Sequence, residues 1–328
     1  MILYKCTQLW HNKKKKSWFK VENILKSDLS SNQLLVRSQF SLISAGTEQM
    51  ILADPPTGKT AEKMQVPYML GSFDADFTYG YSIVGEVVEG PSDWIGRLVH
   101  VMHPHQDLIL VSHEDVFPIP EFIRPETATL ASNLETIINA VWDSGVTVGD
   151  KVLIIGLGII GALLARVISH IPGTEVFIYE KDPYREKICS AINLHCVSDE
   201  SNLTADYTIA FNTSCSGSGL QMAIDQVTHE GSVVELSWFG PKTVTLNLGG
   251  DFHYGRKKII SSQVSHIPVI KRGHFDNRSR KQIVFDLLKE INFDSLISRR
   301  IPFEEAPEFY TQLKERNIRD IGVLFYYK

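Results

Sequence analysis

An apolar run broken by three glycines constrains the fold of this chain more than any other stretch. Residues 152–167 read VLIIGLGIIGALLARV and place Gly156, Gly158 and Gly161 in the spacing G-x-G-x-x-G. The pattern is that of a strand followed directly by a helix, and in that context the spacing is typical of a loop that binds a dinucleotide pyrophosphate. The first glycine permits the turn, the second lets backbone approach the phosphates, and the third lets the helix pack closely on the strand. A parallel α/β sheet with a dinucleotide crevice is therefore expected.

An acidic residue follows these glycines at the distance expected for ribose recognition. Glu180 lies 19 residues after Gly161, at the end of the strand-like segment EVFIYE. A carboxylate there accepts hydrogen bonds from the adenosine ribose hydroxyls and repels a 2′-phosphate, which favours NAD over NADP. The neighbouring Lys181 and Arg185 can pair with a 2′-phosphate, so NADP stays open. A fold of this class whose crevice binds nothing is the alternative.

The order of the patterned segments predicts two domains. Up to about residue 130, short β-like segments such as LLVRSQFSLI and YSIVGEVVEG alternate with turns rich in Gly, Pro, Asn and Asp. A helical pattern follows in RPETATLASNLETIINAVWDSG, and after it we expect strands at KVLIIG, EVFIYE, DYTIAFNTS, SVVELSW and KIISSQV. Helices are expected to open near Gly158, Pro183 and Gly217, and again in SRKQIVFDLLKEINF and EEAPEFYTQLKER. This alternation predicts a doubly wound parallel sheet after a β-rich domain.

Composition excludes several classes of protein. With 328 residues, 43% of them hydrophobic and 22% charged, and a net charge of -5, the chain is typical of a soluble two-domain protein and not of a nucleic-acid binder. The basic run Lys13–Lys16 lies between strand-like segments, so we expect a solvated hairpin turn there. We expect neither a signal peptide nor a membrane span. Four cysteines without a C-x-x-C pair favour a reducing cytoplasm.

Several motifs together resemble the medium-chain dehydrogenase/reductase superfamily. They read LISAGTE, YGYSIVGEVVEG, GRLVHVMHPHQ, ASNLETIINAVWD, VGDKVLIIGLGIIG, VVELSWFG and DFHYGRKKIISSQVS. The likeness is closest to a bacterial subgroup similar to zinc alcohol dehydrogenases, with bacteriochlorophyllide dehydrogenases as more distant relatives. It implies a GroES-like β-rich catalytic domain at residues 1–132 and 266–328 and a Rossmann domain at 133–265. It also implies a small-molecule substrate and a homodimer formed through the sheet edge near TVTLNL.

The chain departs from that family at the metal positions. The motif C-G-[TS]-[DE], which holds the first zinc ligand, reads AGTE at residues 45–48, and the motif G-H-E reads GYS at residues 80–82. The third ligand position falls on Ala131, and the closely spaced cysteines of a structural zinc lobe are absent. Because Ala, Tyr and Ala cannot make a tetrahedral N/S site, the comparison of motifs implies an enzyme without zinc.

Hydride transfer to or from a carbonyl carbon develops charge on oxygen, so a zinc-free site needs another hydrogen-bond donor. The resemblance offers as catalytic candidates Tyr81, Thr47, His103, Glu48 and Glu135, with Asn133 beside them. Tyr81 either donates to the substrate oxygen or fills the vacated metal cavity. Glu48 can equally form only a salt bridge with a neighbouring residue. Glu135 can equally cap its helix or interact with the helix dipole. Three roles are open for His103. It lines the substrate pocket and takes part in acid/base or hydrogen-bonding chemistry, it is structural, or it binds a metal together with His105, which would lie on the same face of a strand.

The resemblance places Ser237, Ser262 and Val264 near the nicotinamide. The expected cofactor-binding residues are Gly156, Gly158, Ile159, Ile160, Gly161, Glu180, Lys181, Arg185, Thr213, Ser237, Ser262 and Val264. Together these features predict a zinc-independent NAD(P)-dependent oxidoreductase that interconverts an alcohol and a carbonyl or reduces an activated double bond. The alternative is a dinucleotide-binding sensor or partner protein without catalysis.

Overall fold

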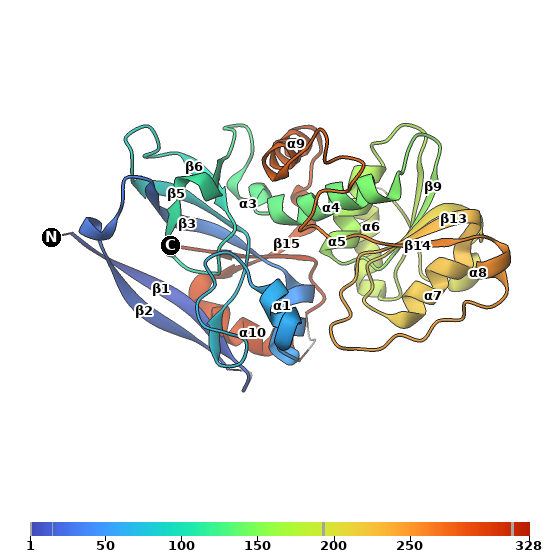
Figure 1. Ribbon diagram of the computed structural model, residues 1–328, viewed down its shortest axis with the longest axis horizontal. Coiled ribbons are helices and arrows are strands. Elements are labelled where there is room, and N and C mark those ends of the chain that lie inside the picture. Colours follow the sequence, from blue (N-terminus) through green and yellow to red (C-terminus); the bar gives the residue numbers. More distant parts are fainter. Residues whose placement is uncertain (1, 15, 192–193, 316–317) are drawn as a thin grey trace. The chain divides into compact units, whose positions relative to one another are not determined.

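The computed structural model describes residues 2–14, 16–191, 194–315 and 318–328 of the chain. They form two compact units, which are described separately below (Figure 1). The first unit comprises Met1–Ser132 and Ile297–Lys328, and the second comprises Asn133–Leu296. Among the described residues, no helix has both the length and the apolar character needed to cross a membrane.

The first unit is rich in β-structure, as its turn-rich sequence predicts. Its strands are β1 (Leu3–Asn12), β2 (Ser17–Leu25), β3 (Gln33–Ile43), β4 (Asp76–Thr78), β5 (Ile83–Glu89), β6 (Leu98–Val101), β7 (Leu108–Ser112), β8 (Val116–Pro118), β15 (Ile297–Pro302) and β16 (Gly322–Tyr326). Its helices are α1 (Ala45–Ala53), α2 (Gly58–Met64), α3 (Pro125–Ala128) and α10 (Ala306–Lys314), and α4 (Ala131–Ser144) begins at its boundary. One sheet has the order β15-β16-β3-β5-β6-β8 with β7 paired to β3, and a smaller one has the order β2-β1-β4.

The basic run of the sequence lies in the connection between β1 and β2. These two strands pair in antiparallel register from Leu3 opposite Leu25 to His11 opposite Ser17. The described lysines of the run are exposed, and Lys13 forms an exposed ion pair with Asp74 at 2.8 Å. The predicted solvated hairpin is therefore confirmed for the residues that the structure describes.

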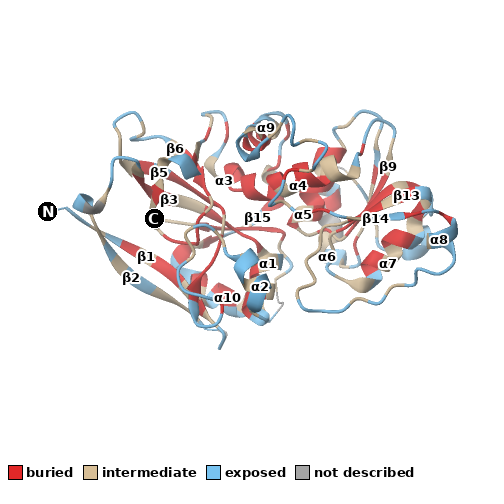
Figure 2. Ribbon diagram, in the orientation of Figure 1, coloured by how far each residue is buried: buried red, intermediate tan, exposed pale blue. Residues whose placement is uncertain are grey.

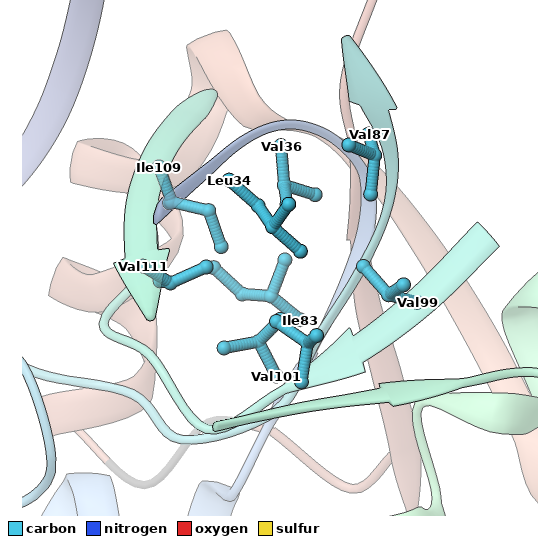
Figure 3. Packing of buried hydrophobic residues seen from close by; sticks show 9 residues of the cluster. Leu34, Val36, Ile83, Val87, Val99, Val101, Ile109 and Val111 are labelled. Carbon is cyan, nitrogen blue, oxygen red and sulfur yellow. The ribbon is translucent and has the colours of Figure 1, made fainter. Parts of the chain in front are cut away.

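The core of the larger sheet in the first unit consists of branched aliphatic side chains (Figure 3). Its fully buried members are Leu34, Val36, Ile83, Val87, Val99, Val101, Ile109, Val111 and Val116. They recur at every second position of β3, β6 and β7, which places them on one face of the pleated sheet. Burial of each such side chain stabilises the folded chain by about 1.5–3 kcal/mol relative to leaving it exposed to water.

The second unit is the predicted doubly wound fold. Its strands are β9 (Lys151–Ile155), β10 (Glu175–Tyr179), β11 (His195–Val197), β12 (Tyr207–Asn212), β13 (Val227–Glu235) and β14 (Lys258–Ser261). Its helices are α5 (Ile159–Ile168), α6 (Pro183–Ala191), α7 (Gly217–Gln226), α8 (Asp251–Tyr254) and α9 (Asn277–Glu290). All strands are parallel in the order β11-β10-β9-β12-β13-β14. The order reverses between β9 and β12, and a ligand of such a sheet binds at the carboxyl ends of the strands beside that reversal.

Three details of the second unit differ from the sequence-based expectation. The short strand β11 was not predicted, because three residues are too few to show a period. Residues 266–296, which were expected in the GroES-like domain, group with the second unit, since Arg280 and Lys281 of α9 are buried against Glu135. The segment TVTLNL at residues 243–248 forms no strand, and the sheet edge on that side is β14.

Figure 2 shows the contrast in burial within each unit. In the second unit, most of α5 is buried, whereas α8 contains no buried residue. In the first unit, β3 is largely buried and β2 contains no buried residue. Several polar side chains are nevertheless buried in these units, among them Glu48, Glu135 and Glu180.

Candidate cofactor and catalytic sites

The glycine loop connects β9 to α5 in the second unit, and two of its glycines are sterically required. Gly156 has φ of +99°, a conformation that other residues rarely adopt, and a side chain on it would lie 3.0 Å from the Ser214 backbone. A side chain on Gly161 would come within 2.0 Å of the Gly156 carbonyl oxygen. The loop therefore brings helix and strand into the close contact that its spacing predicts.

The middle glycine faces open space. Gly158 is the N-cap of α5 and contributes no side-chain hydrogen bond to the helix terminus. A side chain added to Gly158 would meet no atom within 4 Å. The first N–H groups of an α-helix lack partners within the helix, and this end therefore offers a cradle that fits a pyrophosphate. Ile159 and Ile160 provide the first residues of the same helix.

Glu180 directly follows β10, where the ribose-binding acid was expected. It is 6% exposed, and its carboxylate accepts hydrogen bonds from the backbone N–H of Leu157 at 2.8 Å and of Asp182 at 2.9 Å. Arg185 approaches the same carboxylate at 3.8 Å, and Lys181 is exposed. Each carboxylate oxygen keeps a lone pair that can accept a ribose hydroxyl. The nearby guanidinium keeps a 2′-phosphate possible as well.

The predicted residues that follow β12 and β13 are hydrogen-bonded to neighbouring backbone, Thr213 to the glycine loop and Ser237 to the chain that follows β12. The Thr213 hydroxyl donates to the carbonyls of Ile155 at 3.1 Å and Gly156 at 2.8 Å, so it fixes the turn. The Ser237 hydroxyl accepts a hydrogen bond from the Cys215 backbone N–H at 3.0 Å. Both side chains thus lie at the carboxyl edge of the sheet, with their hydroxyl groups already in use.

A polar face of α4 holds the segment that follows β14. Asp143 accepts a hydrogen bond from the Ser262 hydroxyl at 2.6 Å. Asn139 donates to the carbonyl oxygens of Gln263 at 3.0 Å and His266 at 2.7 Å. Since Asn139 and Asp143 are four residues apart, they lie on one side of the helix. This face therefore fixes the backbone around the predicted position Val264.

Glu135 continues the same face one turn earlier and is an ion-pair partner. Its carboxylate lies 2.5 Å from the Lys281 ammonium and 3.3 Å from the Arg280 guanidinium, and all three residues are at most 5% exposed. Arg280 also donates to Asn139 at 2.7 Å and to the Val264 carbonyl at 2.8 Å. These contacts favour the structural alternative for Glu135 over proton transfer.

A second polar cluster lies in the first unit around the start of α1. The Tyr81 hydroxyl donates to the hydroxyl of Ser44, the N-cap residue of α1. Burial raises the pKa of Tyr81 to about 12, and hydrogen bonds with Ser44 and Thr47 oppose that shift. Tyr81 therefore stays protonated at neutral pH and can serve as a hydrogen-bond donor. Thr47 is half-buried beside it.

Glu48 connects this cluster to the interior of the first unit. Its carboxylate is 1% exposed and accepts hydrogen bonds from the Ser44 backbone N–H at 2.8 Å and from the Tyr310 hydroxyl. The His105 ring lies 3.4 Å from the same carboxylate and is hydrogen-bonded to Ser41 at 2.7 Å. Burial, with Glu48 beside it, raises the pKa of Tyr310. Glu48 is thus the centre of a fully buried network.

His103 and His105 do not form the pair on one strand face that their spacing suggested. Both lie after β6 in a loop, because Pro104 cannot donate to a strand ladder. The His103 ring donates to the Pro104 carbonyl at 2.8 Å and stacks on Tyr68 at 5.2 Å between ring centroids. Burial lowers the pKa of His103 to about 4. Among the described residues, no hydrogen bond joins it to Tyr81, Thr47 or Glu48.

The positions of the family's metal ligands do not fit zinc. Ala45 opens α1, Ala131 opens α4, and Tyr81 carries the bond to Ser44. Over the described ranges, no three His, Cys, Asp or Glu side chains come together as a metal-binding group. Asn133 is 2% exposed, and its amide nitrogen has no hydrogen-bond partner in the described part of the chain.

Sequence reasoning missed several residues of these sites. Ser44 precedes the AGTE motif directly, and the rule that helices favour Ser at the N-cap was the signal available. Tyr310 lies 262 residues from Glu48 in sequence, and Arg280 lies 145 residues from Glu135. No local pattern identifies partners so distant along the chain.

Comparison with known proteins agrees with this architecture. No family model matches the chain. The curated relatives include D-guloside 3-dehydrogenase of Shigella flexneri, 22% identical over 74% of this chain and 75% of the relative, and (R,R)-butanediol dehydrogenase of Bacillus subtilis, 22% identical over 89% and 96%.

Solved structures show the same fold over the whole chain. L-idonate 5-dehydrogenase of Escherichia coli has a TM-score of 0.79 at 15% identity and covers 99% of both chains. The short chain alcohol dehydrogenase of Escherichia coli CFT073, solved with NADH, has a TM-score of 0.75 at 14% identity and covers 98% of this chain and 99% of its own.

Proposed function

Since the chain has the fold of the medium-chain dehydrogenase/reductase superfamily, with its GroES-like and Rossmann domains, we propose that it is an NAD(P)-dependent oxidoreductase. The observation that carries this proposal is the open N-cap of α5 at Gly158, with Glu180 bonded to the adjacent loop. A nicotinamide dinucleotide bound there donates or accepts the hydride. The related dehydrogenases act on a guloside and on butanediol by name, which supports an alcohol and a carbonyl compound as the reacting pair.

The first unit supplies groups that suit the proton side of such a reaction. Charge that develops on the substrate oxygen requires a donor, and the Tyr81 hydroxyl is a protonated donor in its cluster. That hydroxyl donates its one proton to Ser44 in the structure, so a substrate oxygen would take the place of Ser44 as the acceptor, and Thr47 adds a second hydroxyl beside it. Reduction of an activated double bond would use the same donor at a carbonyl conjugated with it.

Zinc independence is part of the proposal. The residues at the expected ligand positions are two alanines and a tyrosine that is already hydrogen-bonded, and they offer no three N or S ligands. Elemental analysis of the purified protein is expected to find no stoichiometric zinc. About one zinc per chain that survives mild chelation would contradict this part.

NAD is the proposed cofactor because the Glu180 carboxylate opposes a 2′-phosphate. We further propose a small-molecule substrate, a cytoplasmic location in keeping with four cysteines that form no C-x-x-C pair, and a homodimer formed through the edge of the parallel sheet. Equal affinity for NADH and NADPH would mean that Arg185 compensates for the carboxylate. A strong preference for NADPH would contradict the assignment to NAD.

Titration of nicotinamide fluorescence tests the central proposal. The wild-type chain should bind NADH, and Gly158→Val should abolish binding, because the added side chain occupies the space reserved for the pyrophosphate. Gly273→Val is a matched control in the same unit, since a side chain there also meets no atom within 4 Å. A wild-type chain that binds neither NADH nor NADPH would refute the proposal. Binding without turnover of any alcohol or carbonyl in a broad panel would favour the dinucleotide sensor instead.

A further inference from the structure

The carboxyl edge of the parallel sheet divides into two halves at the order reversal. Tyr179 of β10 pairs with Ile155 of β9, which pairs with Asn212 of β12, and the row continues through Glu235 of β13 to Ser261 of β14. Glu180 lies one residue beyond this row on the β10 side, where the adenosine ribose is expected. A dinucleotide that crosses the reversal at the glycine loop therefore extends its nicotinamide half over β12, β13 and β14.

Glu235 is the carboxylate at the end of β13, and its local structure repeats that of Glu180. It accepts a hydrogen bond from the backbone N–H of Ser237, two residues later, at 2.6 Å. Glu180 likewise accepts from Asp182, two residues later. A second bond reaches Glu235 from the Asn212 amide at 2.7 Å. The two halves of the crevice thus each present one glutamate that is held by the chain that follows it.

The two glutamates differ in charge compensation. Glu180 has Arg185 nearby, whereas no Lys, Arg or His side chain of the described residues forms an ion pair with Glu235. Glu48 and Glu135 also face cationic or titratable partners, His105 for the first and Arg280 with Lys281 for the second. Burial raises the pKa of Glu235, while the hydrogen bonds from Asn212 and Ser237 favour its ionised form. Both carboxylate oxygens of Glu235 accept N–H hydrogen bonds, so these contacts fit the ionised form, and among the described residues no cation pairs with it.

We propose that Glu235 supplies the counter-charge for the oxidised nicotinamide ring and so makes the chain bind NAD⁺ in preference to NADH. The ring carries a positive charge only in its oxidised form, and a nearby fixed carboxylate attracts that form alone. Glu235 is thus a specificity-determining residue for the oxidation state of the cofactor. This inference rests on the proposed binding of a nicotinamide dinucleotide by the second unit.

Equilibrium binding of NAD⁺ and NADH, without substrate, tests the inference. Glu235→Gln should lower the ratio of NAD⁺ affinity to NADH affinity roughly tenfold, because one Coulomb interaction in a partly buried site is lost. Glu235→Asp keeps the charge and should keep the preference for NAD⁺. Glu230→Gln removes an exposed charge from the same strand and should leave the ratio unchanged. Thermal unfolding of each variant verifies that the fold is retained.

The outcomes separate the inference from the function on which it rests. Equal loss of affinity for NAD⁺ and NADH in Glu235→Gln would overturn the inference, since it would show a hydrogen bond common to both forms. An unchanged ratio, or equal ratios for the Gln and Asp variants, would overturn it as well. Failure of the wild-type chain to bind either form would instead refute the proposed function.

Discussion

The candidate cofactor crevice of the second unit and the polar cluster of the first unit are built in different ways. The crevice consists mainly of backbone, with glycines at its turn, helix N–H groups at its floor, and Glu180 bonded to a neighbouring amide. The cluster consists of side chains that meet from β3, α1, α10 and the loop after β6. A site made of backbone is specified within a few residues of sequence, whereas a site made of side chains depends on the completed fold.

The largest expected effect tests the side-chain cluster directly. Tyr81→Phe should lower kcat about 10²–10³-fold and leave cofactor affinity unchanged, because it removes one donor to the developing oxyanion. Steady-state kinetics and NADH titration measure the two quantities separately. Tyr79→Phe is the matched control, since its hydroxyl makes a long 3.3 Å bond to the Met64 carbonyl. Wild-type turnover in Tyr81→Phe would assign this residue to filling space and would direct attention to Thr47 and His103.

The buried network should matter more for stability than for catalysis. Glu48→Ala leaves His105 and Tyr310 without their shared acceptor, and we expect a loss of about 3 kcal/mol in the free energy of unfolding. Denaturant unfolding measures this loss. Glu62→Ala on α2 removes an exposed carboxylate and should change stability by less than about 0.5 kcal/mol. Similar stabilities for the two variants would contradict a structural role for the network.

Two glycines of one loop should separate packing from binding. Gly161→Ala forces a side chain against the Gly156 carbonyl and should destabilise the second unit by about 1–3 kcal/mol. Gly158→Ala meets open space and should leave stability nearly unchanged. Thermal unfolding of the two variants in the absence of cofactor makes the comparison. Equal melting temperatures would show that the loop relaxes, and the contrast between backbone and side-chain sites would weaken.

A smaller effect concerns pH. Because the pKa of His103 is lowered to about 4 from 6.5, the unfolded chain binds a proton below pH 6.5 that the folded chain does not. Stability is therefore full above pH 6.5 and falls as pH decreases, by about 1 kcal/mol between pH 6.5 and 5.5. His103→Phe keeps the stack on Tyr68 and should flatten this slope, although His11, whose pKa is also lowered by burial, retains part of it.

His274→Phe provides the reference for that measurement. His274 is exposed, and its replacement should preserve the pH dependence of the wild-type chain. Urea unfolding between pH 7 and pH 5 compares the three proteins. A slope for His103→Phe as steep as that of the wild type would show that His103 titrates normally in the folded state.

The sequence predicted most of the second unit because its signals are local. The starts of α5, α6 and α7 follow from Gly158, Pro183 and Gly217, and the carboxylate of Glu180 follows from its distance to the glycines. These features depend on helix capping and on glycine conformation, which act within one turn of chain.

The polar cluster could be predicted only in part, for the same physical reason. The position of Tyr81 was evident from a motif, but its acceptor Ser44 and the bond between Glu48 and Tyr310 depend on contacts between distant segments. The spacing of His103 and His105 suggested a strand, and the proline between them prevents one. Hydrogen bonds between residues so far apart in sequence form only when the sheet has been assembled.

The order of strands in the first unit has a consequence for how the protein is made. β16 pairs with β3 from Val323 opposite Ile43 to Tyr326 opposite Phe40, and β15 joins the sheet through β16. A ribosome releases the chain from its amino end, so β3 emerges early and its partner emerges only after the whole second unit. During that interval β5 and β7 can already pair with β3, but the stretch from Phe40 to Ile43 lacks its β16 partner and can pair with a foreign strand. Synthesis of this protein therefore passes through a stage in which that stretch of β3 is open to aggregation until β16 has been made.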